Sequence, residues 1–168
     1  SGSIKHDGPI GGLVGRSSKI IIRSSFSGTI YAPESGNVGG ITGLNSGLID
    51  QSYTEGSITA YMHVGGIAGH SYQGVIQNTY SLMDITGQMY VGGIVGSSSD
   101  TELSGLIVHG DITGAISVSV ITPTYHDYDY DVLFTGRIYS ETYVVEENVL
   151  YYQNQSFTVP LTNQIQDS

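Results

Sequence analysis

With 168 residues, of which 12% are charged, the chain has the length of one domain and enough apolar residues for a continuous core. Its formal net charge of −10 disfavours nucleic acid or an anionic membrane as a partner, because both would repel an acidic surface. The sequence lacks cysteine, which excludes disulfides and thiol chemistry, and no apolar run approaches the roughly 20 residues of a membrane-spanning helix. Many short apolar runs separated by Gly, Ser, Thr and Asn predict an all-β chain rich in turns.

One hexapeptide pattern occurs four times. It consists, in order, of an apolar residue, two glycines, two further residues and a third glycine. The copies begin at Ile10, Val38, Val64 and Val91, so their spacing is nearly constant. A period in this range is typical of stacked repeats, in which each unit buries its apolar face only against its neighbours.

Two further sets of apolar residues keep a period of 27. The first set is Ile22, Ile49, Ile76 and Leu103, and the second is Phe26, Tyr53, Tyr80, Ile107 and Phe134. Residues 26–31 and 134–139 also agree at four of six positions. This agreement beyond the last Gly-Gly copy predicts a fifth turn that closes near residue 139.

Residue parity within one unit predicts where the chain turns. Ile76, Asn78 and Tyr80 share a parity and would face one way along a strand. Ile85 has the opposite parity, which predicts a corner between Tyr80 and Ile85 if both ends are buried. The segments between such corners are too short for helical crossovers, and none shows a sustained helical period.

The pattern therefore predicts an all-β fold, a parallel β-solenoid with about five turns of ~27 residues, in which equivalent residues stack along the core. We expect residues 1–139 to form the turns and residues 140–168 to form an atypical C-terminal cap or a linker to a following domain. Ser1-Gly-Ser-Ile4 is similar to Glu55-Gly-Ser-Ile58, which favours a longer array before this chain unless the first residues derive from a vector.

One unit reads Val64-Gly-Gly-Ile-Ala-Gly69, then Gly74-Val-Ile-Gln-Asn-Thr-Tyr80 and Ile85-Thr-Gly87, and it resembles the GLUG repeat. The closing segments Asn148-Val-Leu-Tyr-Tyr152 and Leu161–Asp167 are similar to those that follow GLUG arrays. The fourth unit departs from the pattern, since Gly105 replaces the expected Asn, and the fifth is degenerate. GLUG repeats occur in large bacterial surface proteins, including adhesin-like proteins and the non-catalytic parts of IgA-cleaving metallopeptidases. The resemblance therefore implies extracellular display, on a bacterial cell surface or secreted, with no catalytic residues of its own.

The most polar and aromatic run of the chain follows the fourth unit. Our candidate ligand surface consists of Tyr125, Asp127, Tyr128, Asp129, Tyr130 and Asp131. On a strand, the three carboxylates would share one face, where they offer oxygen ligands for Ca²⁺, although three are too few alone. The tyrosines could present amphipathic surfaces to a sugar or a protein. A solvated acidic loop with tyrosines packed as a cap explains the same run and is the simpler interpretation.

Other polar residues give weaker signals. His63 and His70 flank one Gly-Gly copy and approach each other only if that segment bends; without a nearby acid we expect no metal there. Asp84 and Asp111 repeat at the same period and would stack as paired acids or as a polar outward column. A threonine column with the same period, Thr59, Thr86 and Thr113, is a weak indication of ice binding.

These observations favour a non-catalytic module, either a rigid stalk or a solenoid that presents a ligand site. The sequence has no metallopeptidase HExxH motif, nucleophile elbow or P-loop, and we expect no cofactor. Partners would be a host glycan, a host or bacterial surface protein, and flanking domains of a longer chain. The alternatives are a carbohydrate-active β-helix enzyme and an ice- or surface-binding solenoid. The enzyme is disfavoured because Arg137 is the sole Lys or Arg after residue 23.

Overall fold

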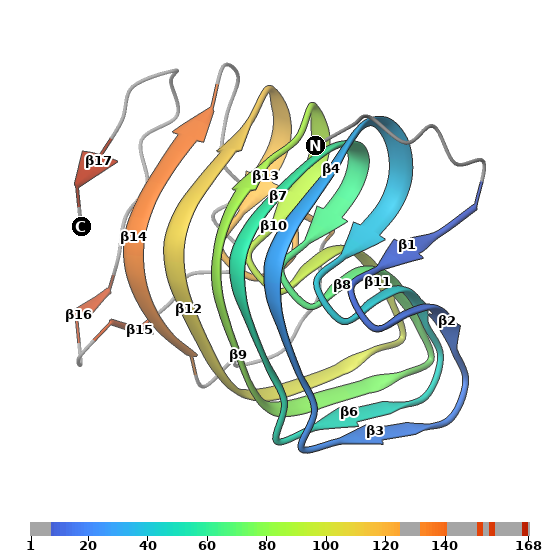
Figure 1. Ribbon diagram of the computed structural model, residues 1–168. Helices are drawn as coiled ribbons and strands as arrows, with labels where there is room; N and C mark the ends of the chain where they lie inside the picture. The colour runs from blue at the N-terminus through green and yellow to red at the C-terminus, as the bar shows by residue number, and fades with distance from the viewer. Residues whose placement is uncertain (1–7, 125–131, 141–150, 153–154, 157–165, 168) are drawn as a thin grey trace.

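The computed structural model describes residues 8–124, 132–140, 151–152, 155–156 and 166–167. These residues form a solenoid of parallel strands without a helix, which confirms the predicted fold class (Figure 1). The coil makes about four turns rather than the predicted five. The repeated pattern at residues 134–139 does lie in a strand, β14 (Val132–Ser140), but the described residues add no further parallel strand beyond it. No helix in the described part of the chain is long and apolar enough to cross a membrane.

Each full turn combines one long strand with shorter strands that are separated by corners. In chain order the strands before β14 are β1 (Ile10–Gly11), β2 (Val14–Ser17), β3 (Ile20–Ile22), β4 (Ser25–Gly39), β5 (Thr42–Asn45), β6 (Leu48–Asp50), β7 (Tyr53–Gly65), β8 (Ala68–Tyr72), β9 (Val75–Thr86), β10 (Met89–Gly92), β11 (Val95–Ser99), β12 (Glu102–Gly114) and β13 (Ile116–Ser119). After β14 come β15 (Tyr151–Tyr152), β16 (Gln155–Ser156) and β17 (Gln166–Asp167).

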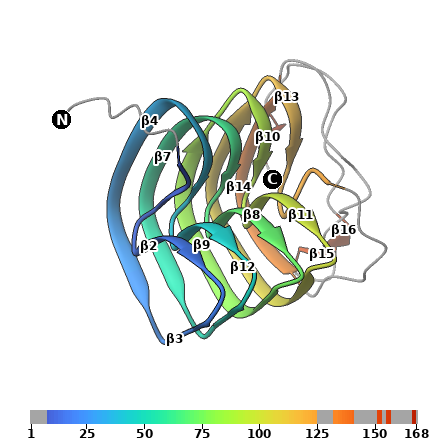
Figure 2. The same cartoon turned by 90° about the vertical axis from the view of Figure 1, so that its right-hand side faces the viewer.

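The strands build the sides of a coil around one core. The long strands β4, β7, β9, β12 and β14 lie side by side in this order, with the two-residue β1 beside β4, and each neighbouring pair is parallel. The short strands β2, β5, β8 and β11 form a second parallel sheet on another side of the coil (Figure 2). At the C-terminal end, β17 pairs with β14 in the antiparallel direction, and β15 and β16 form a separate antiparallel pair.

The register of β4 explains the uneven spacing of the hexapeptides. Ser25 pairs with Tyr53 near the start of the strand, whereas Val38 pairs with Val64 near its end, so the offset between partners changes along β4. The register shifts between Ala32 and Gly36, where β4 carries two more residues than β7. A local bulge therefore absorbs the difference, and the equivalent side chains on either side of it still stack.

The glycines of the hexapeptide lie where the chain leaves no room for a side chain. A Cβ on the second glycine would lie 2.0 Å from Ser81 Oγ at Gly66 and 2.6 Å from Thr54 Cγ2 at Gly40. A Cβ on the third glycine, at Gly69, would lie 2.3 Å from the backbone nitrogen of Val38. The repeated motif is thus a packing requirement, because one side of the coil approaches the other at these points.

Core residues stack in columns. The register confirms the middle members of both predicted columns, whereas Ile22, Phe26 and Phe134 at their ends are displaced by one residue. Ile21 lies opposite Ile49, whereas Ile22 lies opposite Asp50 and is 45% exposed. Likewise, Phe26 and Phe134 belong to an inward column with Thr54, Ser81 and Val108. The outward column beside it consists of Ser25, Tyr53, Tyr80 and Ile107. A strict count of 27 fails where a turn is longer or shorter than its neighbours, and a slip of one position moves a side chain to the other face.

Residues at the corners adopt left-handed backbone angles, and the corner residues of successive turns lie next to one another along the coil. Arg23, Gln51, Asn78 and Gly105 share one corner, with φ values of 52°, 49°, 48° and 58°. The corner in β9 therefore lies at Asn78, and the prediction of a corner between Tyr80 and Ile85 is wrong: Ile76 is buried while Tyr80 faces outward. Glycine and Asn tolerate this backbone region best, which explains why Gly105 replaces Asn in the fourth unit.

Candidate functional site

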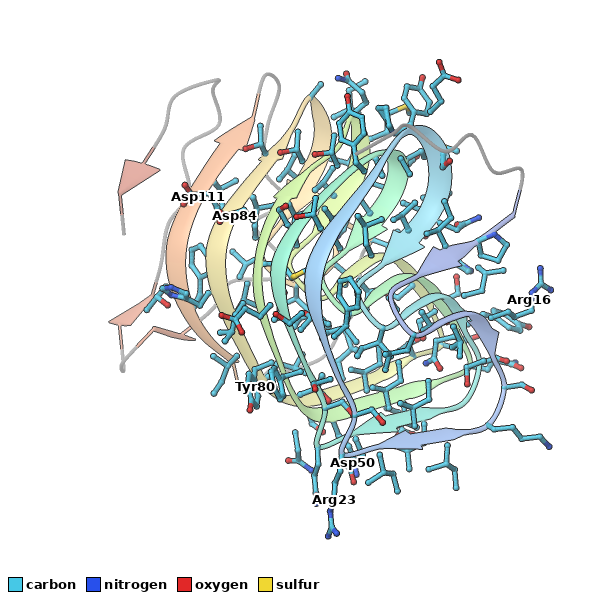
Figure 3. All side chains as sticks on the ribbon, viewed as in Figure 1. Arg16, Arg23, Asp50, Tyr80, Asp84 and Asp111 are labelled. Carbon is cyan, nitrogen blue, oxygen red and sulfur yellow. The ribbon has the colours of Figure 1, made fainter. Side chains whose placement is uncertain are left out.

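The predicted ligand surface at Tyr125, Asp127, Tyr128, Asp129, Tyr130 and Asp131 lies outside the described residues. Within the described residues, the best candidate is the outer face of the long sheet, meaning the outward side chains of β4, β7, β9 and β12 (Figure 3). Side chains along these strands alternate between the core and solvent, so each turn contributes one residue to every outward column.

Two tyrosines form the aromatic part of the outer face. Tyr53 and Tyr80 lie opposite each other in β7 and β9, and their rings are parallel, with centroids 5.0 Å apart and planes at 4°. Tyr80 is 36% exposed, which leaves part of its ring accessible. Stacking keeps both rings in one orientation, so this aromatic surface is already formed without a ligand.

Polar side chains surround the tyrosines at the adjacent corner. Asn78 Nδ2 donates a hydrogen bond to Asp50 Oδ1 at 3.0 Å, and Arg23 Nε donates to Gln51 Oε1 at 3.0 Å. Arg23, Asp50 and Tyr80 mark this corner at the lower end of the sheet in Figure 3. These pairs were not predicted from the sequence, although each joins polar residues 28 positions apart, which is one turn.

The carboxylates of Asp84 and Asp111 do lie on neighbouring strands of the outer face (Figure 3). Asp84 Oδ1 accepts a hydrogen bond from the backbone N–H of Asp111 at 2.9 Å, so one carboxylate is positioned by the next turn. The backbone register continues this column to Ser57 on one side and to Arg137 on the other. Arg137 is the register partner of Asp111, a pairing that was not predicted from the sequence.

The predicted threonine ladder is present as one column. Thr59, Thr86 and Thr113 are register partners on β7, β9 and β12. Tyr31 precedes them and Tyr139 follows them in the same register. The register shows no second threonine column beside it in β7, β9 and β12, because Ser57, Asp84 and Asp111 occupy the neighbouring outward positions.

The segment between His63 and His70 bends, and it brings these two histidines together on another side of the coil. Their ring centroids are 6.1 Å apart with a tilt of 44°, and His63 also contacts the ring of Tyr90 at 5.1 Å. Burial lowers the pKa of both imidazoles, and the neighbouring His70 lowers the pKa of His63 further. Both rings are therefore predominantly neutral at neutral pH.

The described residues contain no group of three or more His, Asp or Glu side chains arranged to hold a metal ion. The outer face instead offers an aromatic pair, amides and hydroxyls, with carboxylates that hydrogen-bond within the sheet. Such a surface can bind a polar ligand by hydrogen bonds and ring contacts, at little cost in ordering because it is preformed. Comparisons with protein-family models, with curated proteins and with solved structures find no match for this chain.

Proposed function

We propose that this chain is a non-catalytic structural and adhesive module, a GLUG-type solenoid segment of a bacterial cell-surface or secreted protein. The observation that carries the proposal is the continuous parallel pairing from β1 through β14. Each turn advances the coil by about 4.8 Å, so four turns make a short stiff segment of about 20 Å. Further turns of the same kind would extend it without changing its cross-section.

The adhesive part of the proposal rests on the outer face. The Tyr53–Tyr80 stack and the Asp50–Asn78 pair present aromatic and amide groups from consecutive turns. A host glycan, or a protein on a host or bacterial surface, offers hydroxyls and amides that match these groups. The resemblance to GLUG repeats of adhesin-like proteins supports the same partners and an extracellular location.

A binding experiment tests this function. The whole chain is applied to arrays of glycans and host surface proteins, with and without Ca²⁺, and the Tyr80→Ser variant is compared with Tyr72→Ser. Tyr72 is also exposed but lies on β8, away from the long sheet. Binding that is weakened by Tyr80→Ser alone supports an adhesive outer face. A folded chain that binds nothing on the arrays supports the spacer role, whereas turnover of an applied glycan contradicts a non-catalytic module.

One observation favours a second candidate, a carbohydrate-active enzyme. The register places Asp84, Asp111 and Arg137 at equivalent backbone positions of three neighbouring strands, and proton abstraction next to a uronate needs a general base such as a carboxylate and a cation that stabilises the developing charge. Incubation with acidic polysaccharides tests it: turnover that is lost in both Asp84→Asn and Asp111→Asn identifies an enzyme. Absence of turnover on every acidic polysaccharide rejects this alternative.

A further inference from the structure

Two columns of side chains meet beside the Gly-Gly corner of the third unit. One column is the second left-handed corner, Asn37, His63, Tyr90 and Ser117, whose φ values lie between 50° and 54°. The other is an outward column of the short sheet, Arg16, Leu44, His70 and Ser97. Gly69 packs directly against the backbone of Asn37 and Val38, which holds the two columns against each other. The third unit alone has a histidine in both columns.

The separation of these histidines suits a shared metal ion. An imidazole nitrogen binds Zn²⁺ at about 2.0–2.1 Å, which places the metal about 3.2 Å from the ring centroid. Two such rings at a tetrahedral angle have centroids about 5.2 Å apart, and wider angles bring this to about 6 Å. The observed centroid separation of 6.1 Å exceeds the tetrahedral value by about 1 Å and lies close to the wider-angle value.

The hydrogen bonds of both rings leave one nitrogen of each for a ligand role. His63 Nδ1 lies 3.1 Å from Asn37 Oδ1, an arrangement in which Nδ1–H donates and Nε2 keeps its lone pair. His70 Nδ1 is buried and has no hydrogen-bond partner among the described residues, while a hydrogen bond joins this ring to the backbone of Ser97. Metal-binding histidines usually donate their second N–H to a carbonyl in this way, which fixes the ring orientation.

We propose that His63 and His70 form a two-histidine site for a borderline divalent cation such as Zn²⁺, Ni²⁺ or Cu²⁺, with water or a partner's side chain completing its coordination. Imidazole selects these cations over Ca²⁺ and Mg²⁺, which require oxygen ligands. The site joins the long sheet to the short sheet within one turn, so a bound metal stabilises that corner. This inference does not depend on the proposed adhesive function.

The repeat itself supplies matched variants. Asn37 occupies the place of His63 one turn earlier, and Leu44 occupies that of His70, so His63→Asn and His70→Leu copy side chains that the fold already accepts. His109 lies on β12, where its Nδ1 bonds Thr135 Oγ1 at 2.5 Å, and His109→Asn is the control.

Calorimetric titration of the whole chain with Zn²⁺ or Ni²⁺ at neutral pH tests the site, with thermal unfolding as a second readout. We expect saturable 1:1 binding that raises Tm, and about a tenfold or greater loss of affinity in His63→Asn and in His70→Leu but not in His109→Asn. Circular dichroism without metal checks that the variants fold, and if His63→Asn does not fold, His70→Leu alone decides. Binding that the variants leave unchanged, or no saturation at millimolar metal, overturns the proposal.

Discussion

The rings of Tyr53 and Tyr80 stack face to face on neighbouring turns, with centroids 5.0 Å apart and an angle of 4° between their planes. The two residues are one period apart in the sequence and are direct register partners on β7 and β9. The stack therefore follows from the length of one turn, and it links the stability of the coil to the shape of the outer face.

Replacing either tyrosine should loosen both turns. We expect Tyr80→Ala to lower the free energy of unfolding by about 1–2 kcal/mol, because the ring contact and part of a half-exposed side chain are lost. Urea denaturation measures the change. A double-mutant cycle with Tyr53→Ala should give a coupling free energy of about 0.5–1.5 kcal/mol, and strictly additive losses would contradict a stabilising stack.

Two glycine-to-alanine variants distinguish a glycine that close packing requires from one that it does not. Gly66→Ala places a Cβ 2.0 Å from Ser81 Oγ and 2.3 Å from the carbonyl oxygen of Gly93, so we expect a loss of about 3 kcal/mol or more. In Gly36→Ala the new Cβ lies at an ordinary 3.6 Å from its nearest atom, the carbonyl oxygen of Met62. This variant should raise the free energy of unfolding by about 0.5 kcal/mol, because alanine lowers the conformational entropy of the unfolded chain. Chemical denaturation of both variants is the measurement. Equal effects at the two positions would contradict close packing at the Gly-Gly corner.

The inward column of Thr54 and Ser81 contains one satisfied and one unsatisfied hydroxyl. Thr54 Oγ1 donates to the carbonyl oxygen of Gly66 at 2.8 Å, whereas Ser81 Oγ is buried without a partner among the described residues. Thr54→Val should therefore cost about 1–2 kcal/mol, while Ser81→Ala should be neutral or stabilise by up to about 1 kcal/mol. Equilibrium unfolding of both variants compares them. A large loss for Ser81→Ala would reveal a partner for its hydroxyl.

The fold class could be predicted because its cause is local and repeated. Three glycines per unit are required by close approaches of the backbone, so the sequence shows the same signal at every turn. The columns could be predicted only where turns have equal lengths: Ile49 and Ile76 were paired correctly, but Ile22 and Phe26 were displaced by one residue. The bulge between Ala32 and Gly36 makes the hexapeptide spacing uneven, but the spacing does not show where along β4 the extra residues lie.

The candidate sites were harder to predict, because they arise from bends that side-chain parity does not reveal. A left-handed residue at Asn78 turns β9 without interrupting it, and so Tyr80 faces outward although Ile76 is buried. The approach of His63 and His70 depends on a similar left-handed corner at His63 itself. Histidine is enriched in this backbone region together with Asn, but most histidines lie elsewhere, so one histidine does not identify such a corner in a sequence.

The stability of the corner at His63 and His70 should depend on pH. Burial lowers the pKa of both imidazoles below 6.5, so the folded chain binds these protons more weakly than the unfolded chain does. Their contribution to stability is then complete above the unfolded pKa of about 6.5 and is lost as pH falls through the lower folded values.

A comparison of the wild type with the His63→Asn/His70→Leu double variant isolates this effect. The free energy of unfolding in urea is measured for both proteins from neutral to mildly acidic pH, in a buffer that contains a metal chelator. Carboxylates titrate in both proteins, and the phenol of Tyr90, which contacts the His63 ring, remains in both. We therefore expect the difference between the two stability curves to shift in favour of the variant as the pH falls below about 6.5, since only the wild type must take up protons at buried rings. A difference that stays constant over this range would show that both histidines titrate alike in the folded and unfolded chain, and that burial does not hold them neutral.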